Sequence, residues 1–359
     1  MEKYNIYHRQ DGRWEGRLLK KKDEKGKRKY KYIFGKSKEE VIRKIDAIRK
    51  VKCSESGSYT VEKIFNEWYE SISHKVKEST LSNYRIKASK HILPDFGDAY
   101  INSFNAQYIY SFIKIKQQNG LSNRYISDIV VMVKSIFKYA SDNYNIYNPL
   151  SNISLPRKKI SEIRLLEENE TDKLKKYIFE NQNRTTMGIA LSLSTGLRIG
   201  ELCALQWEDI DLKKRIMTVR KTIQRISCQH ENKKTKIIIT EPKSDTSNRT
   251  IPIPDFMIKF MEKFRGDKKE YILSGKNKAI EPRTLQYRFA KVLKNVNLPS
   301  IHFHALRHMF ASNCIKAGFD VKALSEILGH SNVEITLNRY VHSSFEQKIK
   351  YMNMLEPIF

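Results

Sequence analysis

Two short polar segments divide this chain into three parts, and this division limits what it can fold into more than any other feature. Residues 53–58 read Cys-Ser-Glu-Ser-Gly-Ser, and residues 148–159 contain two prolines followed by a basic run. Both compositions are typical of linkers. At 359 residues the chain is also longer than one hydrophobic core usually serves. We therefore expect three domains, at residues 1–52, 59–153 and 162–359.

The charge of the chain points to a polyanionic partner. It has 67 Lys and Arg against 40 Asp and Glu, a formal net charge of +27. Such an excess attracts nucleic acid, and an anionic membrane surface is the rival interpretation. No apolar run approaches the roughly 20 residues of a spanning helix, and the first 22 residues lack the apolar stretch of a secretory signal. We expect a cytoplasmic protein that binds nucleic acid and no membrane.

The four cysteines favour neither a metal site nor a disulfide framework. They lie far apart and form no C-x-x-C pair. We expect reduced thiols that mostly pack in the interior. The four are Cys53, Cys203, Cys228 and Cys314.

The N-terminal part has the pattern of a small sheet backed by a helix. Strands are predicted at residues 4–9, 13–22 and 28–34, and an S-x-x-E capping box then opens a helix to about residue 49. Alternation along the third strand sets three aromatic residues opposite three lysines. We expect the aromatic face, Tyr30, Tyr32 and Phe34, to pack under the helix residues Val41, Ile45 and Ile48, and the lysine face to stay cationic.

This basic sheet is predicted to bind DNA. For one strand judged alone, a solvated lysine face is the better interpretation, by roughly two to one. Residues 1–52, however, hold 19 Lys or Arg against eight Asp or Glu, a net charge of +11. A three-stranded sheet can enter the major groove. The predicted contact residues are Arg13, Arg17, Lys27, Lys29 and Lys31.

The middle part is predicted to be all-helical. Apolar residues at three- and four-residue spacing follow a Thr60 cap, and further helices are expected at residues 79–92, 106–118 and 122–143. The linker that follows ends in a basic run that could lie along a phosphate backbone. Its predicted contact residues are Arg157, Lys158 and Lys159.

In the third part, Arg198 stands in an unusual setting. It belongs to the segment T-G-L-R-I-G-E-L, where Gly196 and Gly200 allow tight turns and leucines surround the guanidinium. A buried arginine needs a partner. Pairing with Glu201 and binding of an external anion are equally compatible with the sequence.

Two later segments carry further candidate groups. In H-A-L-R-H, the i, i+3 spacing sets His304 and Arg307 on one helix face. His304 and His308 also have the i, i+4 spacing of zinc ligands, but no third ligand is evident, so zinc has about one chance in ten. A helix at residues 321–328 is predicted to stop at Gly329 and to present His330. Nothing intrinsic marks Tyr340, ten residues later, as a nucleophile.

In this order, the segments around Arg198, His304 to His308, His330 and Tyr340 resemble the catalytic domain of the tyrosine recombinases, the phage integrase family. The resemblance covers roughly residues 60–359, and the N-terminal part is similar to arm-site-binding domains of conjugative-transposon and phage integrases. It implies a multidomain, mainly α fold with small β-sheets: a three-stranded sheet plus helix, a helical core-binding domain of the SAM-like kind, and a mixed α+β catalytic domain.

The resemblance also implies roles. Arg198 and Arg307 would clamp the scissile phosphate, Tyr340 would attack it, His304 would act as base, His330 would donate a hydrogen bond, and Lys243 would protonate the leaving oxygen. Lys243 is chosen over its lysine neighbours because it precedes the S-x-R-x-I-P-like stretch from Ser247. No metal or other cofactor is implied, so the reaction should persist in chelator.

The implied partners are double-stranded DNA at core and arm sites, a homotetramer acting through a Holliday junction, an excisionase and a host DNA-bending protein. The apolar tail at residues 343–359 could dock on its own domain or on a neighbouring protomer. Two alternatives stay open: a DNA-binding regulator that never cuts, and the same chemistry in a type IB topoisomerase or a chromosome-dimer resolvase.

Overall fold

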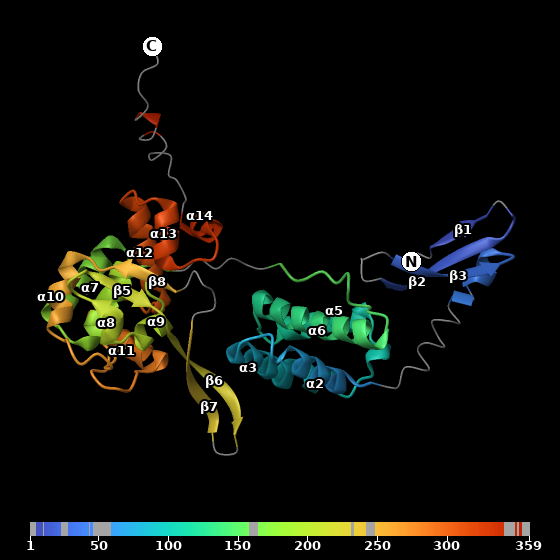
Figure 1. Ribbon diagram of the computed structural model, residues 1–359, viewed down its shortest axis with the longest axis horizontal. Coiled ribbons are helices and arrows are strands. Elements are labelled where there is room, and N and C mark those ends of the chain that lie inside the picture. The colour runs from blue at the N-terminus through green and yellow to red at the C-terminus, as the bar shows by residue number, and fades with distance from the viewer. Residues whose placement is uncertain are drawn as a thin grey trace, which may run out of the picture. The chain divides into compact units, whose positions relative to one another are not determined.

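The computed structural model describes residues 5–9, 11–22, 28–42, 44–45, 59–157, 164–230, 233–241, 248–340, 349 and 352–353. Chain contacts divide it into two compact units, residues 1–160 and 161–359, and each is described by itself. The expected fold class is confirmed: a mainly helical protein with an N-terminal three-stranded sheet, a helical domain and a mixed α/β domain (Figure 1).

The N-terminal sheet is an antiparallel meander in the order β1-β2-β3. Its strands are β1 (Ile6–His8), β2 (Trp14–Lys22) and β3 (Arg28–Gly35). Gly12 lies in the first turn with a φ of 79°, a conformation that favours glycine. Residues 38–42 and 44–45 are helical, and the Ser37 hydroxyl accepts a hydrogen bond from the Glu40 N–H at 3.1 Å, as the capping box predicts.

The predicted assignment of the two sheet faces is wrong. Ile33 packs against Val41 and Ile45, and all three are buried. Tyr32 and Phe34, which alternate with Ile33, are 51% and 42% exposed. The helix packs directly against the backbone of β2 at Gly16. A Cβ added to Gly16 would lie 2.7 Å from two helix side chains, so a larger residue would not fit there. An aliphatic side chain and a glycine fit beneath the helix, whereas the tyrosine and phenylalanine rings stay outside under arginine side chains.

The helical domain follows the predicted pattern. It contains α2 (Val61–Ile72), α3 (Glu78–Lys87), a π-helical turn (Ala88–Ile92), α4 (Leu93–Phe96), a 3-10 turn (Ile101–Ser103), α5 (Ala106–Gln118) and α6 (Asn123–Tyr144). Thr60 caps α2 by accepting the Lys63 N–H, and Ser122 caps α6 by accepting the Tyr125 N–H. These apolar faces share one core, in which aromatic rings meet in edge-on or tilted contacts at centroid distances of 5.0–5.1 Å, namely Phe96, Phe104, Phe112 and Phe137.

The third domain wraps helices around a central buried helix, α8. Its elements are α7 (Glu168–Glu180), α8 (Arg184–Thr195), α9 (Ile199–Ala204), a 3-10 turn (Trp207–Asp209), β4 (Ile210–Asp211), β5 (Ile216–Val219), β6 (Thr222–His230), β7 (Lys233–Thr240), β8 (Arg249–Pro252), α10 (Asp255–Glu262), α11 (Pro282–Asn295), α12 (His304–Lys316), α13 (Val321–Leu328) and α14 (Val333–Tyr340). A Cβ on Gly188 of α8 would lie 2.6 Å from Leu273. Such close packing fixes the frame that carries the candidate residues.

The described strands of the third domain form one three-stranded sheet and one two-stranded sheet. β8 pairs with β5 in the sheet β4-β5-β8, whereas β6 and β7 form a separate hairpin. Lys243 lies in residues 242–247, outside the described part of the chain. The hairpin extends away from the domain body (Figure 1).

Three of the four cysteines lie in the described part of the chain. Cys203 and Cys314 are buried thiols, and burial raises the pKa of Cys203 to about 12 and that of Cys314 to about 11, whereas Cys228 is half-buried. Cys53 lies outside the described residues. Within the described residues, no helix combines the length and the apolar character needed to cross a membrane.

Candidate active site

Three arginines from separate segments meet at the carboxyl end of α13. The carbonyl oxygens of three successive residues, Ile327, Leu328 and Gly329, each accept a hydrogen bond from a different guanidinium group. The donors are Arg249 at 2.6 Å, Arg307 at 2.8 Å and Arg198 at 3.0 Å, in that order. The negative end of a helix dipole favours cations, so α13 gathers positive charge at one point.

Arg198 reaches this point from the turn between α8 and α9. Gly196 ends α8 with a φ of 67°, and a Cβ there would lie 2.6 Å from Phe310 and 2.7 Å from Leu328. Only glycine fits both the conformation and the space. The Arg198 side chain is 36% exposed and donates from Nη1 to Glu201 Oε1 at 2.7 Å. Pairing with Glu201 and exposure toward an external anion therefore occur together.

Glu201 is shared between two arginines. Its side chain is 3% exposed, and it accepts bonds from the backbone N–H and Nη1 of Arg198 and from Nη1 and Nη2 of Arg249. Burial would raise the pKa of Glu201, but the hydrogen bonds and charges of Arg249 and Arg198 outweigh burial and lower it. The carboxylate is thus ionised.

Arg307 is almost completely enclosed, with 2% of its surface exposed. On α12, it donates from Nη1 to the Gly196 carbonyl at 2.8 Å and from Nη2 to the Leu328 carbonyl. These bonds tie α12 to the ends of α8 and α13. His304, one turn earlier on α12, is exposed, and its ring meets that of buried His308 edge-on at 4.7 Å.

His330 follows directly after Gly329, whose φ of 64° ends α13 as predicted. Its Nδ1 lies 2.8 Å from the hydroxyl of Thr336, a fully buried residue of α14. With Nδ1 engaged, a hydrogen bond to a phosphate would come from Nε2. The eight-residue helix α14 ends on Tyr340, of which the structure describes only the backbone.

The structure thus brings Arg198, Arg307 and His330 together, with His304 on the same helix as Arg307. The sequence-based interpretation missed Arg249 and Thr336. Arg249 stands in the same S-x-R-x-I-P-like stretch that follows Lys243 in the sequence. No signal in the sequence marked Thr336.

The predicted DNA-contact residues are described in part. Arg13 and Arg157 are exposed, and Arg17 is 40% exposed. Lys27, Lys158 and Lys159 lie outside the described residues, and only the backbone of Lys29 and Lys31 is described.

The uncovered face of the N-terminal sheet is organised around a buried acid. The side chain of Glu15 is 5% exposed and pairs with Arg9 at 2.6 Å and Arg17 at 2.8 Å. Arg17 lies over the rings of Tyr7 and Tyr32, at 4.7 and 5.6 Å from their centroids. Arg9 and Arg13 lie over Phe34 at 5.6 and 5.8 Å. Sequence reasoning missed Arg9 and Glu15, although the period of two along β2 sets Glu15 and Arg17 on one face.

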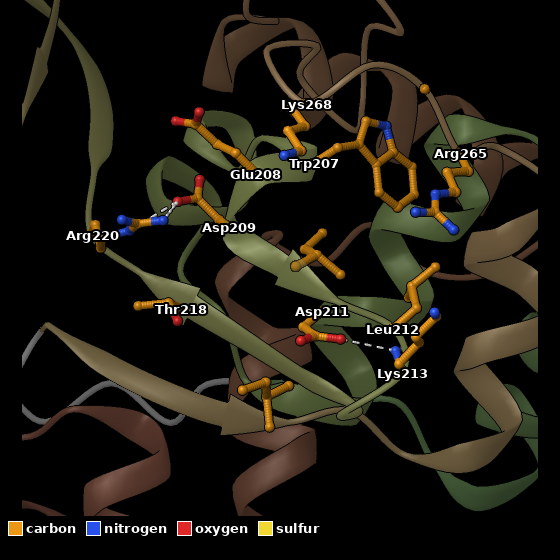
Figure 2. Close-up of a pocket in the computed structure, with 13 residues that line it drawn as sticks. Trp207, Glu208, Asp209, Asp211, Leu212, Lys213, Thr218, Arg220, Arg265 and Lys268 are labelled. Atoms are coloured by element: carbon orange, nitrogen blue, oxygen red, sulfur yellow. Dashed lines mark hydrogen bonds and ion pairs between the residues drawn. The ribbon is translucent and has the colours of Figure 1, made fainter.

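A hollow of about 680 Å³ lies beside β4 and β5 of the third domain, apart from the arginines at the end of α13 (Figure 2). Its wall carries both charges: Arg220 pairs with Asp209 at 2.7 Å, and the Asp211 carboxylate accepts the Lys213 N–H. None of the candidate catalytic residues whose side chains are described, Arg198, His304, Arg307 and His330, lines it. Among the described residues, no group of three His, Cys, Asp or Glu side chains is placed to hold a metal ion.

Sequence comparison decides the family. The profile of the phage integrase family matches residues 164–347, and that of the N-terminal SAM-like domain of phage integrases matches residues 60–117. The chain belongs to the phage integrase family. It is a site-specific tyrosine recombinase, an enzyme that cleaves and rejoins DNA.

Curated relatives of this recombinase include both Xer-like proteins and integrases of mobile elements. A tyrosine recombinase XerC-like protein of Caldanaerobacter subterraneus is 29% identical over 373 residues, which cover 94% of each chain. The ICEBs1 integrase of Bacillus subtilis is 26% identical over 283 residues, which cover 74% of each.

Two solved structures share the fold. The Tn1549 transposon integrase in complex with a circular intermediate DNA has a TM-score of 0.67 and 24% identity, covering 83% of this chain and 100% of that one. A lambda integrase tetramer bound to a Holliday junction has a TM-score of 0.60 and 19% identity, covering 95% and 98%. At these identities the likeness establishes the fold.

Proposed function

We propose that this recombinase integrates and excises a mobile genetic element through a covalent 3'-phosphotyrosine at Tyr340. The observation that carries the proposal is the convergence of Arg198, Arg307 and His330 at the end of α13, directly before the helix that ends on Tyr340. Two fixed guanidinium groups beside an imidazole are suited to a phosphodiester whose charge rises in the transition state.

In the proposed step, protein side chains carry the protons and no metal ion is required. The Tyr340 hydroxyl oxygen attacks the scissile phosphorus, the bond from phosphorus to the 5' oxygen breaks, and DNA is released with a free 5' hydroxyl. The phenol, with an ordinary pKa of about 10, gives its proton to His304. Lys243 supplies a proton to the leaving 5' oxygen, and His330 donates a hydrogen bond to a non-bridging oxygen. We expect undiminished cleavage in the presence of chelator.

The phosphotyrosine keeps the energy of the broken bond, so a 5' hydroxyl from another duplex reverses the step and exchanges strands without ATP. In our proposal this occurs in a homotetramer on two core sites, through a Holliday junction, in the cytoplasm, with an excisionase and a host DNA-bending protein as further partners. The lambda integrase tetramer on a Holliday junction supports the assembly. The tail at residues 343–359 docks either in cis or in trans.

We assign residues 1–52 to arm-site DNA, residues 59–153 to core-site DNA and residues 162–359 to catalysis. The uncovered sheet face supports the first assignment, because Arg9, Arg13 and Arg17 form a cationic surface that can enter a major groove. Arg157 and its basic neighbours would follow the phosphate backbone. A chromosome-dimer resolvase is the second candidate, favoured by the XerC-like relative that matches over 94% of this chain.

A nicked core-site duplex tests the chemistry. When the nick lies just beyond the cleavage position, the short 5'-hydroxyl fragment diffuses away and the covalent complex accumulates. We expect wild-type protein to form this adduct and Tyr340→Phe to form none, while both bind the duplex equally. Tyr351→Phe, eleven residues further along the sequence, serves as the matched control and should retain the adduct. An adduct formed by Tyr340→Phe would show that the nucleophile is another residue, and no adduct with wild-type protein would favour a regulator that never cuts.

A further inference from the structure

Arg249 is held inside the candidate active site but has no role in the proposed chemistry. It is the first residue of β8, where its backbone pairs with Val219 of β5. Its side chain is 6% exposed, and Nε, Nη1 and Nη2 all donate within the domain, to Ile327 and to Glu201. With all three nitrogens engaged in this way, the guanidinium is held within the domain.

The charges around Glu201 are unequal in number. One carboxylate faces two guanidinium groups, and it cannot neutralise both. Arg249 binds it through two nitrogens at 3.2 and 2.9 Å, in the bidentate geometry that makes the stronger pair. Arg198 contributes one side-chain nitrogen and remains 36% exposed. The pair of Arg249 with Glu201 therefore takes up carboxylate charge that would otherwise act on Arg198 alone.

Arg249 also fixes the end of α13. Its bond to the Ile327 carbonyl precedes the carbonyls that hold Arg307 and Arg198. A Cβ added to Gly329 would lie 2.9 Å from Arg249 Nη1, so the guanidinium packs directly against the turn that leads to His330. One side chain thus connects β8, α9 and the α13 end.

We propose that Arg249 is a positioning residue: it takes up the charge of Glu201 and fixes the α13 end, and so leaves the charge of Arg198 uncompensated by Glu201 and directed at the scissile phosphate. This inference rests on the role of Arg198 in the proposed function. Without Arg249, Glu201 would pair fully with Arg198 and cancel the charge that the phosphate requires.

The decisive experiment compares Arg249→Lys, Arg249→Met and the double variant Arg249→Met with Glu201→Gln. Arg215→Lys is the matched control, because Arg215 pairs with Asp255 on the surface, with side chains 59% and 76% exposed. For each full-length protein, three quantities are measured: the single-turnover rate constant of adduct formation on saturating nicked core-site DNA, the DNA affinity and the thermal midpoint.

We expect Arg249→Met to lower the rate constant by about 10²-fold, the loss that misplacement of a reacting group causes, with DNA affinity near that of wild type. Arg249→Lys keeps the charge without the fork and should lose about tenfold. Adding Glu201→Gln to Arg249→Met should restore about tenfold, because the carboxylate that cancels Arg198 is gone. Arg215→Lys should match wild type.

A double variant no faster than Arg249→Met would overturn the inference. So would Arg249 variants that melt earlier but keep the wild-type rate constant per folded molecule, since that pattern belongs to a purely structural arginine. Should Arg249→Met fail to fold, equal rates for Arg249→Lys and Arg215→Lys would overturn it. Failure of the wild-type protein to form any adduct would instead refute the proposed function.

Discussion

At the scale of single residues, the site depends on backbone carbonyls as much as on acids. Arg307 is 2% exposed and is fixed by the carbonyls of Gly196 and Leu328. A hydrogen bond to a neutral carbonyl fixes a guanidinium without cancelling its charge. The site can therefore be rigid before DNA binds and still attract phosphate, which is the arrangement that stabilises a developing negative charge most effectively.

Thr336 gives a prediction at this scale. Its hydroxyl lies 2.8 Å from His330 Nδ1, and the residue is fully buried. Thr336→Val keeps the shape and removes the hydroxyl, so we expect a folded protein in which the imidazole is no longer oriented and adduct formation slows by about tenfold. Thr336→Ser keeps the hydroxyl and should cleave nearly as wild type. Single-turnover assays on nicked DNA measure the rate of adduct formation for both variants. Equal rates for Thr336→Val and Thr336→Ser would show that the hydroxyl does not contribute to the site.

Residue-scale prediction from the sequence reached its limit where partners are distant. Arg198 and Glu201 are three residues apart, so the sequence alone indicates their ion pair as one of two alternatives. The hydrogen bond from Arg249 to the Ile327 carbonyl joins residues 78 apart in the sequence, and no local sequence pattern predicts it. The same holds for Thr336, a buried polar residue that the helical pattern of α14 does not distinguish.

At the scale of elements, helix ends were predictable and sheet faces were not. α5 and α13 have the predicted bounds, Ala106–Gln118 and Val321–Leu328, because caps and terminal glycines act on the nearest turn. In β3, by contrast, both faces carry side chains able to pack. Alternation identifies the two faces but does not decide which one the helix covers. The aromatic rings of β3 are predicted to pack beneath the helix, but Ile33 packs there instead.

The uncovered face of the N-terminal sheet predicts a pH dependence. Hydrogen bonds from Arg17 and Arg9 lower the pKa of Glu15, and the bonds from Arg13 lower that of Asp11 to about 2. A carboxyl group whose pKa is lower in the folded state stabilises that state above its unfolded pKa, near 4.3 for Glu, and loses the effect as the pH falls through the folded value. The sheet should therefore unfold more easily as the pH falls below about 4.3.

Fluorine NMR of fluorotryptophan-labelled protein can follow the unfolding of the N-terminal sheet separately, because each domain contains one tryptophan: Trp14, Trp68 and Trp207. We expect the urea midpoint of the Trp14 signal to fall on acidification. Glu15→Gln should lower that midpoint at neutral pH and flatten its acid dependence. A midpoint in Glu15→Gln that depends on pH as in wild type would mean that the two arginines do not stabilise this carboxylate.

At the scale of the whole molecule, charge is distributed unevenly among the domains. Residues 1–52 hold +11 of the net +27 in about one seventh of the chain. Each phosphate contact releases counterions, so this part should dominate the salt dependence of binding to any DNA that it contacts. A recombinase with a separate cationic module can hold two kinds of DNA site at once. That capacity separates an integrase with arm sites from a resolvase that acts on core sites alone.

Deletion of residues 1–52 tests this division of labour. We expect the shortened protein to cleave nicked core-site DNA at the wild-type rate, because every candidate catalytic residue lies beyond residue 190. Its affinity for distal arm-site DNA should fall sharply, with a shallower dependence on salt. Electrophoretic mobility shifts over a salt series measure the affinities. Equal loss at both kinds of site would contradict a separate arm-binding domain.

A charge-matched pair of variants identifies the surface responsible. Alanine at Arg9, Arg13 and Arg17 removes three charges from the uncovered sheet face, and alanine at Lys36, Lys38 and Lys44 removes three exposed charges from the segment that leads into and forms the helix. If the sheet face enters the major groove, the arginine variant should lose arm-site affinity and sequence preference together, since base contacts carry the specificity. The lysine variant should lose affinity alike for arm-site and unrelated DNA. Equal behaviour of the two variants would mean that net charge, and not the arginine face, holds the arm site.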